Sequence, residues 1–322
     1  MQAKVRIGMI GAGAVAARHV RALLAMDGVE VAGVADPALE RARELAAEAG
    51  AAAYPNHMEL LEAERLDAVY ICVPPFAHGA PELAVIDAGL PMFVEKPVAI
   101  DQETAMMIAA RLAERPVLTC TGYHWRWLDI FDRAADLLAD RPARLVQCSW
   151  LDRVPPPPWW LRRDGSGGQT IEQTTHVLDT ARALAGNVIE VHAYAEAALP
   201  AADIHDVSVA TLRFDSGAVG TVASTCLLPR LHRAGVHIVA DGLSLELTET
   251  ELLVEENGRR EAWTADADAR PRPDRDFIAA VRGGEDRIRV PWPEAYRTHL
   301  VACAITRSAD EDRPLRVEAN GG

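Results

Sequence analysis

A glycine-rich turn between an apolar strand and a helix constrains the fold of this chain more than any other feature. The run VRIGMI is suited to a buried strand, and GAGAVAARHVRALLAM follows it at once with helical periodicity. Gly11, Gly13 and Ala16 form G-x-G-x-x-A at the junction, where the first glycine permits a tight turn and the second lets the backbone approach a pyrophosphate. Ala14 and Val15 begin the helix, whose unpaired N–H groups favour an anion. The junction therefore predicts a dinucleotide-binding βαβ unit.

An acidic residue follows at the distance that this interpretation requires. A second apolar run, VEVAGVA, ends at Asp36, about 20 residues beyond the glycines, where a ribose-binding acid is expected. Its carboxylate would accept hydrogen bonds from ribose hydroxyls and repel a 2′-phosphate, so NAD is favoured over NADP. Arg41 and Arg43 weaken this preference, although a solvated helix face explains them better. The alternative for the whole segment is an ordinary tight turn with an acid at a strand end.

Strand and helix patterns continue to alternate up to about residue 122. DAVYICV, LPMFVEKPVAI and VLTCTGY are typical of strands, while PPFAHGAPELAVIDAG and DQETAMMIAARLAERP are typical of helical segments. This alternation predicts an α/β Rossmann domain with a doubly wound parallel sheet in residues 1–122. Ligands of such sheets bind beyond the carboxyl ends of the strands. The candidate site residues at those ends are Val73, Pro74, Pro75, His78, Glu95, Lys96, Tyr123 and His124.

The pattern changes after about residue 143. Period-two alternation with short turns predicts strands in RLVQCSW, VIEVHAYAEAAL, HDVSVATLRF, AVGTVASTCLL, HRAGVHIVAD and LSLELTETELLVEE. Residues 123–322 are therefore expected to form an α+β substrate-binding and oligomerisation domain. Its large, mainly antiparallel open sheet would pack one face on helices and leave the other available. A helix near 293–309 is expected to pack back toward the first domain.

Several motifs together resemble the Gfo/Idh/MocA family, which includes glucose–fructose oxidoreductase, inositol dehydrogenase and the rhizopine-catabolism protein. The motifs are IGMIGAGAVAARHV, VPPFAH, EKP at 95–97, SGGQTIEQTTHVLDTARALAG and DFIAAVRGG. The resemblance covers nearly the whole chain. It implies an NAD(P)-dependent oxidoreductase, and a homodimer or homotetramer assembled through the open face of the C-terminal sheet.

The resemblance also implies an active site, residue by residue. Lys96 matches the family's active-site lysine, Pro97 matches a cis proline that helps to position it, and His176 matches the catalytic histidine. Glu172 stands where many members carry aspartate in the pattern D-x-x-x-H, so this chain departs from the pattern by one methylene group. The alternative role for Glu172 is that of an acid near a helix N-terminus, which complements the helix dipole.

Substrate-binding candidates lie in two further segments. GYHWRW at 122–127 stands where many members have a form close to GYNRRF, and His124 and Arg126 within it are candidates for substrate contact. In PPPPWWLRRDGSGG the prolines favour a stiff connection, Trp160 could stack on a sugar ring, and Arg163 could bind hydroxyls or a carboxylate. Filling an oligomer interface is the alternative for the tryptophans. Four other histidines are expected to be ordinary surface or helix residues: His19, His57, His232 and His299.

Composition excludes several classes of partner. The 322 residues carry 33 basic and 47 acidic side chains, a net charge of −14 that argues against nucleic acid or an anionic membrane. No apolar stretch reaches the roughly 20 residues of a membrane span. The cysteines are scattered, without C-x-x-C or a histidine at metal spacing, so no metal site is predicted and a cytoplasmic location is expected. They are Cys72, Cys120, Cys148, Cys226 and Cys303.

Together these features predict an NAD-dependent dehydrogenase that acts on a secondary alcohol of a sugar, polyol or related ring compound. His176 would contact the substrate and remove its hydroxyl proton, Lys96 would donate to the same oxygen and help hold the nicotinamide ribose, and Glu172 would orient His176 or neutralise Lys96. One open alternative is a redox-neutral epimerase, eliminase or aldose–aldose oxidoreductase with tightly held NAD. Another is a non-catalytic nucleotide-binding regulator, against which the intact Lys96 and His176 argue.

Overall fold

The computed structural model describes residues 4–317 and divides into two compact units. The first unit contains Met1–Ala99, Glu103–Gly122 and Arg270–Pro293. The second contains Ile100–Gln102, Tyr123–Ala269 and Glu294–Gly322. Each unit is described below by itself.

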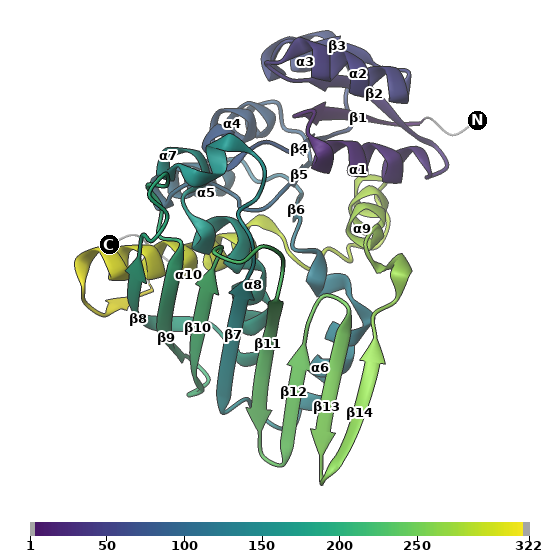
Figure 1. Cartoon of the computed structure of the whole chain (residues 1–322). Helices are drawn as coiled ribbons and strands as arrows, with labels where there is room; N and C mark the ends of the chain where they lie inside the picture. The colour runs from purple at the N-terminus through teal and green to yellow at the C-terminus, as the bar shows by residue number, and fades with distance from the viewer. Residues whose placement is uncertain (1–3, 318–322) are drawn as a thin grey trace. The chain divides into compact units, whose positions relative to one another are not determined.

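The first unit is built on a six-stranded parallel sheet with the order β3-β2-β1-β4-β5-β6 (Figure 1). This is the strand order of the doubly wound Rossmann fold, so the predicted α/β class is confirmed. The strands are β1 Val5–Ile10, β2 Val29–Ala35, β3 Ala52–Tyr54, β4 Ala68–Ile71, β5 Met92–Val94 and β6 Thr119–Thr121. The helices are α1 Ala14–Leu24, α2 Leu39–Ala49, α3 His57–Ala63, η1 Pro75–Ala77, α4 Ala80–Asp87, α5 Gln102–Glu114 and α9 Arg272–Val281.

Local sequence accounts for the limits of several of these elements. The α2 helix ends at Gly50, whose φ of 64° is the left-handed conformation that glycine adopts without strain. The α3 helix begins after Asn56, whose side chain accepts the backbone N–H of Glu59 at 2.9 Å. All four residues of β4 are buried, as expected for a strand covered on both faces.

The second unit contains a nine-stranded sheet with the order β14-β13-β12-β11-β7-β10-β9-β8-β15 (Figure 1). Neighbouring strands are antiparallel except for β7 and β10, so the predicted mainly antiparallel sheet is confirmed. The strands are β7 Leu145–Leu151, β8 Val188–Glu196, β9 Val207–Phe214, β10 Val219–Thr225, β11 Arg233–Ala240, β12 Leu243–Leu247, β13 Glu251–Glu256, β14 Arg259–Thr264 and β15 Leu315–Arg316.

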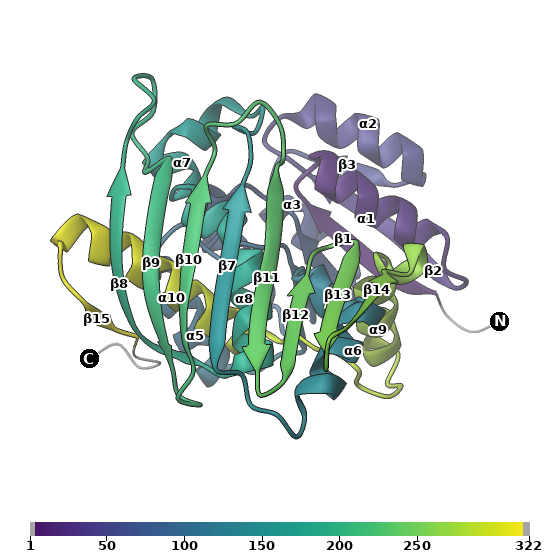
Figure 2. The ribbon, with the colours of Figure 1, turned by 60° about the horizontal axis from the view of Figure 1, so that its bottom comes forward.

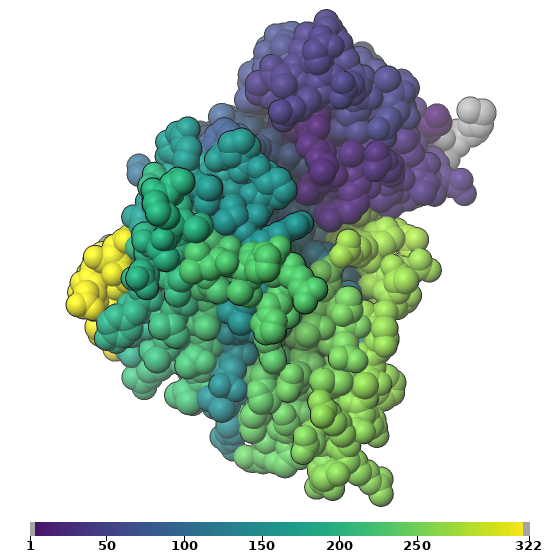
Figure 3. Space-filling view, in the orientation of Figure 1, coloured from purple at the N-terminus to yellow at the C-terminus, as the bar shows by residue number. Residues whose placement is uncertain are grey.

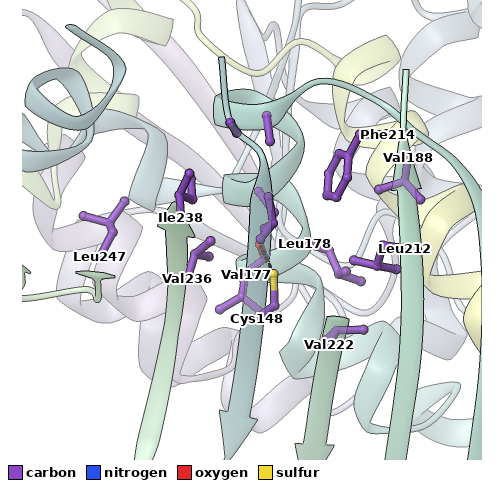
Figure 4. Packing of buried hydrophobic residues seen from close by; sticks show 14 of the residues in the cluster. Cys148, Val177, Leu178, Val188, Leu212, Phe214, Val222, Val236, Ile238 and Leu247 are labelled. Carbon is purple, nitrogen blue, oxygen red and sulfur yellow. Dashed lines mark hydrogen bonds between the residues drawn. The ribbon is translucent and has the colours of Figure 1, made fainter. Parts of the chain in front are cut away.

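Helices cover one face of this sheet and form a continuous core with it. The helices of the unit are η2 His124–Trp127, α6 Asp129–Leu138, η3 Pro158–Leu161, α7 Arg163–Ser166, η4 Thr170–Thr174, α8 Thr175–Ala185, η5 Ala267–Ala269 and α10 Trp292–Glu311. Figure 2 shows α6, α8 and α10 behind the strands. Val177 and Leu178 of α8 pack on Cys148, Val222 and other inward-facing strand residues (Figure 4). The alternation expected from the sequence therefore directs apolar side chains toward α8.

The opposite face of the sheet carries exposed apolar side chains. Tyr194, Val209 and Val219 are between 47% and 59% exposed, and they alternate along their strands with the buried residues of the core. Figure 3 shows side chains from the green part of the chain, which includes β10 to β12, at the surface of the second unit.

None of the helices between residues 4 and 317 combines the length and the apolar character that crossing a membrane demands.

The division into units differs from the expected domains in the last quarter of the chain. The chain passes from one unit to the other between Gly122 and Tyr123, at the expected boundary. The segment Arg270–Pro293, which carries α9, belongs to the first unit, although it was expected in the second domain. The α10 helix, expected to pack back toward the first domain, contributes Val301 and Ile305 to the core of the second unit.

Candidate active site

The turn between β1 and α1 brings the backbone close to its neighbours and leaves open space where a ligand is expected. Gly11 has a φ of +98°, and a Cβ there would lie 2.2 Å from the carbonyl oxygen of Cys72. Gly13 is the N-cap of α1, so no side chain caps the first N–H groups of the helix. A Cβ at Gly13 would meet no protein atom within 4 Å. Ala16 is fully buried against the sheet. The turn therefore needs Gly11 for its own fold, whereas the space beside Gly13 is available to a bound group.

Asp36 is oriented toward this turn by two backbone hydrogen bonds. Its Oδ2 accepts the N–H of Ala12 at 2.9 Å, and its Oδ1 accepts the N–H of Ala38 at 2.8 Å. The carboxylate therefore lies at the end of β2 beside the glycine turn. An uncapped helix N-terminus, an open backbone and an adjacent acid together fit a dinucleotide, with the pyrophosphate at α1 and the ribose at Asp36.

The carboxyl ends of β4 and β5 carry the next group of predicted cofactor contacts. Val73 and Pro74 follow β4 and are partly exposed. Lys96 is partly exposed, and its peptide bond to Pro97 is cis, which confirms the cis proline that the family resemblance implies. Pro75 is buried and begins η1.

His78 is buried and has a carboxylate partner within the first unit. Its Nδ1 is 2.6 Å from Oε1 of Glu82, and both side chains are fully buried. Oε2 of Glu82 also accepts the N–H of Gly79 at 2.6 Å, so the carboxylate closes the N-terminus of α4. His78 therefore has a structural role at the start of α4, and its predicted cofactor contact stays a prediction.

Glu95 belongs to a buried ionic cluster that the sequence analysis missed. His19 of α1 contacts Glu95 through Nε2 at 2.8 Å and Asp274 of α9 through Nδ1 at 2.6 Å. His19 was expected to be an ordinary surface or helix residue. His19 follows Ala16 by three residues and so lies on the buried face of α1, and this helical spacing could have predicted its burial. Asp274 comes from a segment far along the chain, for which no local pattern existed.

In the second unit, aromatic rings surround His176 near the start of α8. The Trp150 and Trp125 rings lie nearly parallel to the His176 ring, with centroids 5.6 Å and 6.2 Å away. The Tyr123 and His124 rings approach edge-on at 5.9 Å and 5.3 Å. Burial raises the pKa of Tyr123, whose hydroxyl also lies 2.6 Å from the Thr175 hydroxyl. Tyr123, His124 and Trp125 thus lie beside the predicted catalytic histidine.

Glu172 lies in a π-helical turn, not in the α-helix that its spacing from His176 suggested. The turn covers Thr170–Thr174 and runs directly into α8. Short π-helical turns are frequent at functional sites. Oε2 of Glu172 accepts the indole N–H of Trp160 at 2.9 Å. Because the π turn changes the helical register, the simple i, i+4 alignment of Glu172 with His176 does not apply.

Trp160 is a buried structural residue in the second unit. It is 0% exposed and packs with Ile204 and Cys226, while its N–H is directed to Glu172. Its ring is therefore not available to stack on a sugar, and the predicted substrate contact is wrong. The tryptophan instead supports the turn that carries Glu172.

Two predicted substrate-binding arginines are bound to carboxylates. Arg163 makes two hydrogen bonds of 3.0 Å to Asp310. Arg126 binds Asp179 through Nε at 2.7 Å and through Nη2 at 3.2 Å. These pairs connect separate elements of the second unit, so both arginines have a packing role, and their predicted substrate contacts stay predictions. His124 remains a candidate, because it is partly exposed and its Nε2 lies 3.0 Å from Glu249.

No group of three or more His, Cys, Asp and Glu side chains that could hold a metal ion occurs between residues 4 and 317. All five cysteines are free and buried. Burial raises the pKa of the Cys148 and Cys303 thiols to about 12. These thiols are therefore in the neutral form near neutral pH and are core residues.

Comparisons with known proteins identify two family matches along the chain. Residues 5–123 match the model described as "Oxidoreductase family, NAD-binding Rossmann fold", and residues 142–245 match the "GFO/IDH/MocA C-terminal domain". Among curated proteins, the chain is 27% identical over 230 residues to myo-inositol 2-dehydrogenase of Thermotoga maritima, a match covering 68% of this chain and 67% of that protein. It is 33% identical over 189 residues to the rhizopine catabolism protein MocA of Rhizobium meliloti, covering 57% of this chain and 58% of that protein.

Among solved structures, the WlbA dehydrogenase of Bordetella pertussis, in complex with NADH and UDP-GlcNAcA, matches 98% of this chain and 99% of its own. The TM-score is 0.86 and the sequence identity is 21%, so the likeness concerns the fold. Both units thus have counterparts of the same architecture.

Proposed function

The chain belongs to the Gfo/Idh/MocA family of NAD-dependent oxidoreductases, and we propose that it oxidises a secondary alcohol of a sugar, polyol or related cyclic compound. The observation that carries the proposal is the anchored Asp36 beside an open glycine turn, because it fits NAD and disfavours a 2′-phosphate. The curated relatives named as inositol dehydrogenases support a polyol or sugar as the substrate class.

The proposed chemistry assigns one task to each site residue. His176 removes the proton of the substrate hydroxyl, and the aromatic rings around it hold the imidazole in a fixed orientation. Lys96 donates a hydrogen bond to the same oxygen and stabilises the negative charge that develops there. NAD, when bound, accepts the hydride from the carbinol carbon. The products are therefore a ketone, reduced nicotinamide and a proton held at His176.

Two further residues are proposed to shape the same reaction. Glu172 orients His176 or neutralises Lys96, and its own position is held by the Trp160 indole. His124 contacts the substrate, since its ring lies 5.3 Å from that of His176. The remaining proposed cofactor contacts are Gly11, Gly13, Ala14, Val15, Ala16, Val73, Pro74, Pro75, Glu95 and Lys96.

A substrate panel tests this function. The purified protein is mixed with NAD or NADP and with sugars, inositols, aminosugars and sugar acids, and the absorbance of reduced nicotinamide is followed. A signal with NAD on one class of compound is expected. Silence with NAD retained by the protein would favour the redox-neutral alternative, in which the cofactor is reduced and reoxidised within one cycle. Silence without bound NAD would overturn the proposal.

Asp36 is expected to set the choice of cofactor. Replacing it with asparagine keeps the side-chain shape, but it removes the negative charge that repels a 2′-phosphate and one of the two oxygens that accept hydrogen bonds. We expect the KM for NAD to rise about tenfold, because a hydrogen bond to a charged group contributes about 1.5–3 kcal/mol. The ratio of kcat/KM for NAD to that for NADP should fall. Glu40→Gln, an exposed acid in the first turn of α2, is the control. Unchanged KM values in D36N would argue against ribose binding by Asp36.

We also propose that copies of the chain associate through the open face of the second unit's sheet. Val209 lies opposite Tyr194 on one side and Ala223 on the other, so an apolar row crosses three strands of the exposed face. A homodimer or homotetramer would remove this row from water. Light scattering that returned the mass of a monomer would remove this proposal.

A further inference from the structure

The buried cluster around His19 is a histidine held between two carboxylates from different elements. Asp274 of α9 and Glu95 after β5 occupy its two ring nitrogens, at 2.6 Å and 2.8 Å. The three side chains are between 4% and 8% exposed. An ionised carboxylate only accepts hydrogen bonds, so a ring that donates to both must carry two N–H groups. The geometry is therefore that of an imidazolium between two carboxylates.

The electrostatics of the cluster agree with this geometry. Burial by itself lowers the pKa of His19, but Asp274 and Glu95 outweigh it and raise the pKa to about 9. Burial alone would raise the pKa of Glu95, yet His19, together with Arg18 and Lys96, lowers it. Both shifts favour the charged forms near neutral pH.

Glu95 connects this cluster directly to the predicted catalytic lysine. Its Oε2 accepts the backbone N–H of Lys96 at 3.2 Å, while its Oε1 faces His19 and also Arg18 at 3.3 Å. Gly122 lies against the carboxylate, and a Cβ there would be 2.5 Å from Oε1. The carboxylate is therefore held on three sides next to the peptide that carries Lys96.

Other groups with ionisable side chains face the cluster, and the buried ones among them are neutral. Burial raises the pKa of Tyr70, Cys72 and Cys120 well above their usual values. The His19 ring packs on Tyr70 and Phe93, with centroids 5.4 Å and 5.0 Å away. The charges that act on Glu95 are those of His19, Arg18 and Lys96, and Asp274 acts on His19.

We propose that His19 is a positioning residue for Lys96. His19 acts through Glu95, and it fixes the turn at Lys96–Pro97 and keeps a negative charge beside the lysine. The inference rests on the proposed role of Lys96 in the reaction. His19 stands on the helix that begins at the glycine turn, and Asp274 ties that helix to α9. One buried link therefore joins the predicted pyrophosphate-binding helix to the predicted catalytic lysine.

The composition of the chain makes Lys96 directly observable. The sequence contains only two lysines, Lys4 and Lys96. Protein labelled with ¹³Cε-lysine therefore gives two lysine NMR signals, and Lys4→Arg identifies which one belongs to Lys96. His19→Gln carries no charge and has only one donor nitrogen, whereas His19 meets the two carboxylates through two different ring nitrogens. In this variant the Lys96 signal is expected to move toward the position of free lysine. The Lys4 signal should stay in place.

Kinetics supply a second readout that depends on the reaction. With any substrate found in the panel, H19Q should lower kcat about tenfold or more and leave the substrate KM within about threefold, since a small misplacement of a catalytic group can cost up to about 100-fold in rate. His205→Gln is the matched control, because it removes another histidine–carboxylate contact, 3.3 Å from Asp310, in the second unit. It should leave the Lys96 signal unchanged.

Stability against pH tests the charge of His19 independently of activity. A histidine whose pKa is raised on folding stabilises the protein fully below about 6.5, and this stability is lost as the pH rises through about 9. The thermal midpoint of the wild type should therefore fall more steeply than that of H19Q between pH 7 and 10. Asp274→Asn, nearly equal in volume to the native residue, replaces H19Q if that variant does not fold.

The outcomes separate this inference from the proposed function. A moved Lys96 signal and a flatter pH dependence support the positioning role even if the panel finds no substrate. A folded H19Q or D274N with an unchanged Lys96 signal overturns the positioning role, whatever the enzyme oxidises. An unchanged kcat in an active H19Q enzyme overturns it as well.

Discussion

Replacing His176 with asparagine is expected to lower kcat by about 100- to 10,000-fold, the usual contribution of a positioned general base. Asparagine cannot take a proton from the substrate hydroxyl at neutral pH. The affinity for NAD should be unchanged, because the glycine turn and Asp36 belong to the first unit and His176 belongs to the second. Steady-state kinetics with the substrate found in the panel, together with a fluorescence titration of NAD, measures both quantities.

His124→Asn is the control variant for His176→Asn. His124 lies beside His176, but its Nε2 contacts Glu249. Because His124 is a proposed substrate contact, its replacement should mainly raise KM. Loss of an interaction made only in the transition state, as proposed for His176, lowers kcat and kcat/KM together. An H176N enzyme that turned over at the wild-type rate would remove His176 from the mechanism. Equal losses of kcat in both variants would indicate disturbed packing among the aromatic rings.

Gly11→Ala is expected to destabilise the first unit by more than about 2 kcal/mol, since it combines a backbone clash with a strained conformation. The new Cβ would lie 2.2 Å from the carbonyl oxygen of Cys72, which is backbone and cannot rotate away. The φ of +98° is also one that L-residues rarely adopt. Urea denaturation followed by circular dichroism measures the free energy of unfolding.

Gly13→Ala provides the contrasting case within the same turn. Its φ is −83°, and a Cβ there would meet no protein atom within 4 Å. The free energy of unfolding should change by less than about 0.5 kcal/mol. The affinity for NAD should fall about tenfold or more, because the methyl group would occupy the space that the pyrophosphate needs. Equal destabilisation in G11A and G13A, with NAD binding kept in G13A, would contradict this division of roles.

Local sequence patterns predicted most of the fold. The alternation of apolar strands with amphipathic helices reflects periods of two and 3.6 residues, which are properties of neighbouring side chains. The two predicted sheets are confirmed by the structure, and the family matches confirm the family assignment. The strand Arg259–Thr264 was missed because all six of its residues are exposed, so it has no apolar face that a pattern could reveal.

Predictions about individual side chains were less successful where the partner lies far along the chain. Trp160 was assigned to substrate because of its aromatic ring, but Ile204 and Cys226 bury it. Arg163 was assigned to substrate because of its charge, but Asp310 binds it. Each partner is more than 40 positions away. A single sequence contains no information on which of many acids or apolar residues will fill such a role.

The sequence by itself determined the glycine turn, the acid at Asp36 and the two types of sheet, because each depends on residues that are close along the chain. Lys96 and His176 were assigned by family resemblance, and their roles stay predictions. Only the tertiary structure decided the cluster of His19, Glu95 and Asp274, the π-helical turn at Glu172 and the burial of Trp160. Burying a charge is costly unless an opposite charge meets it, so the fold must bring distant partners together before such residues have a role.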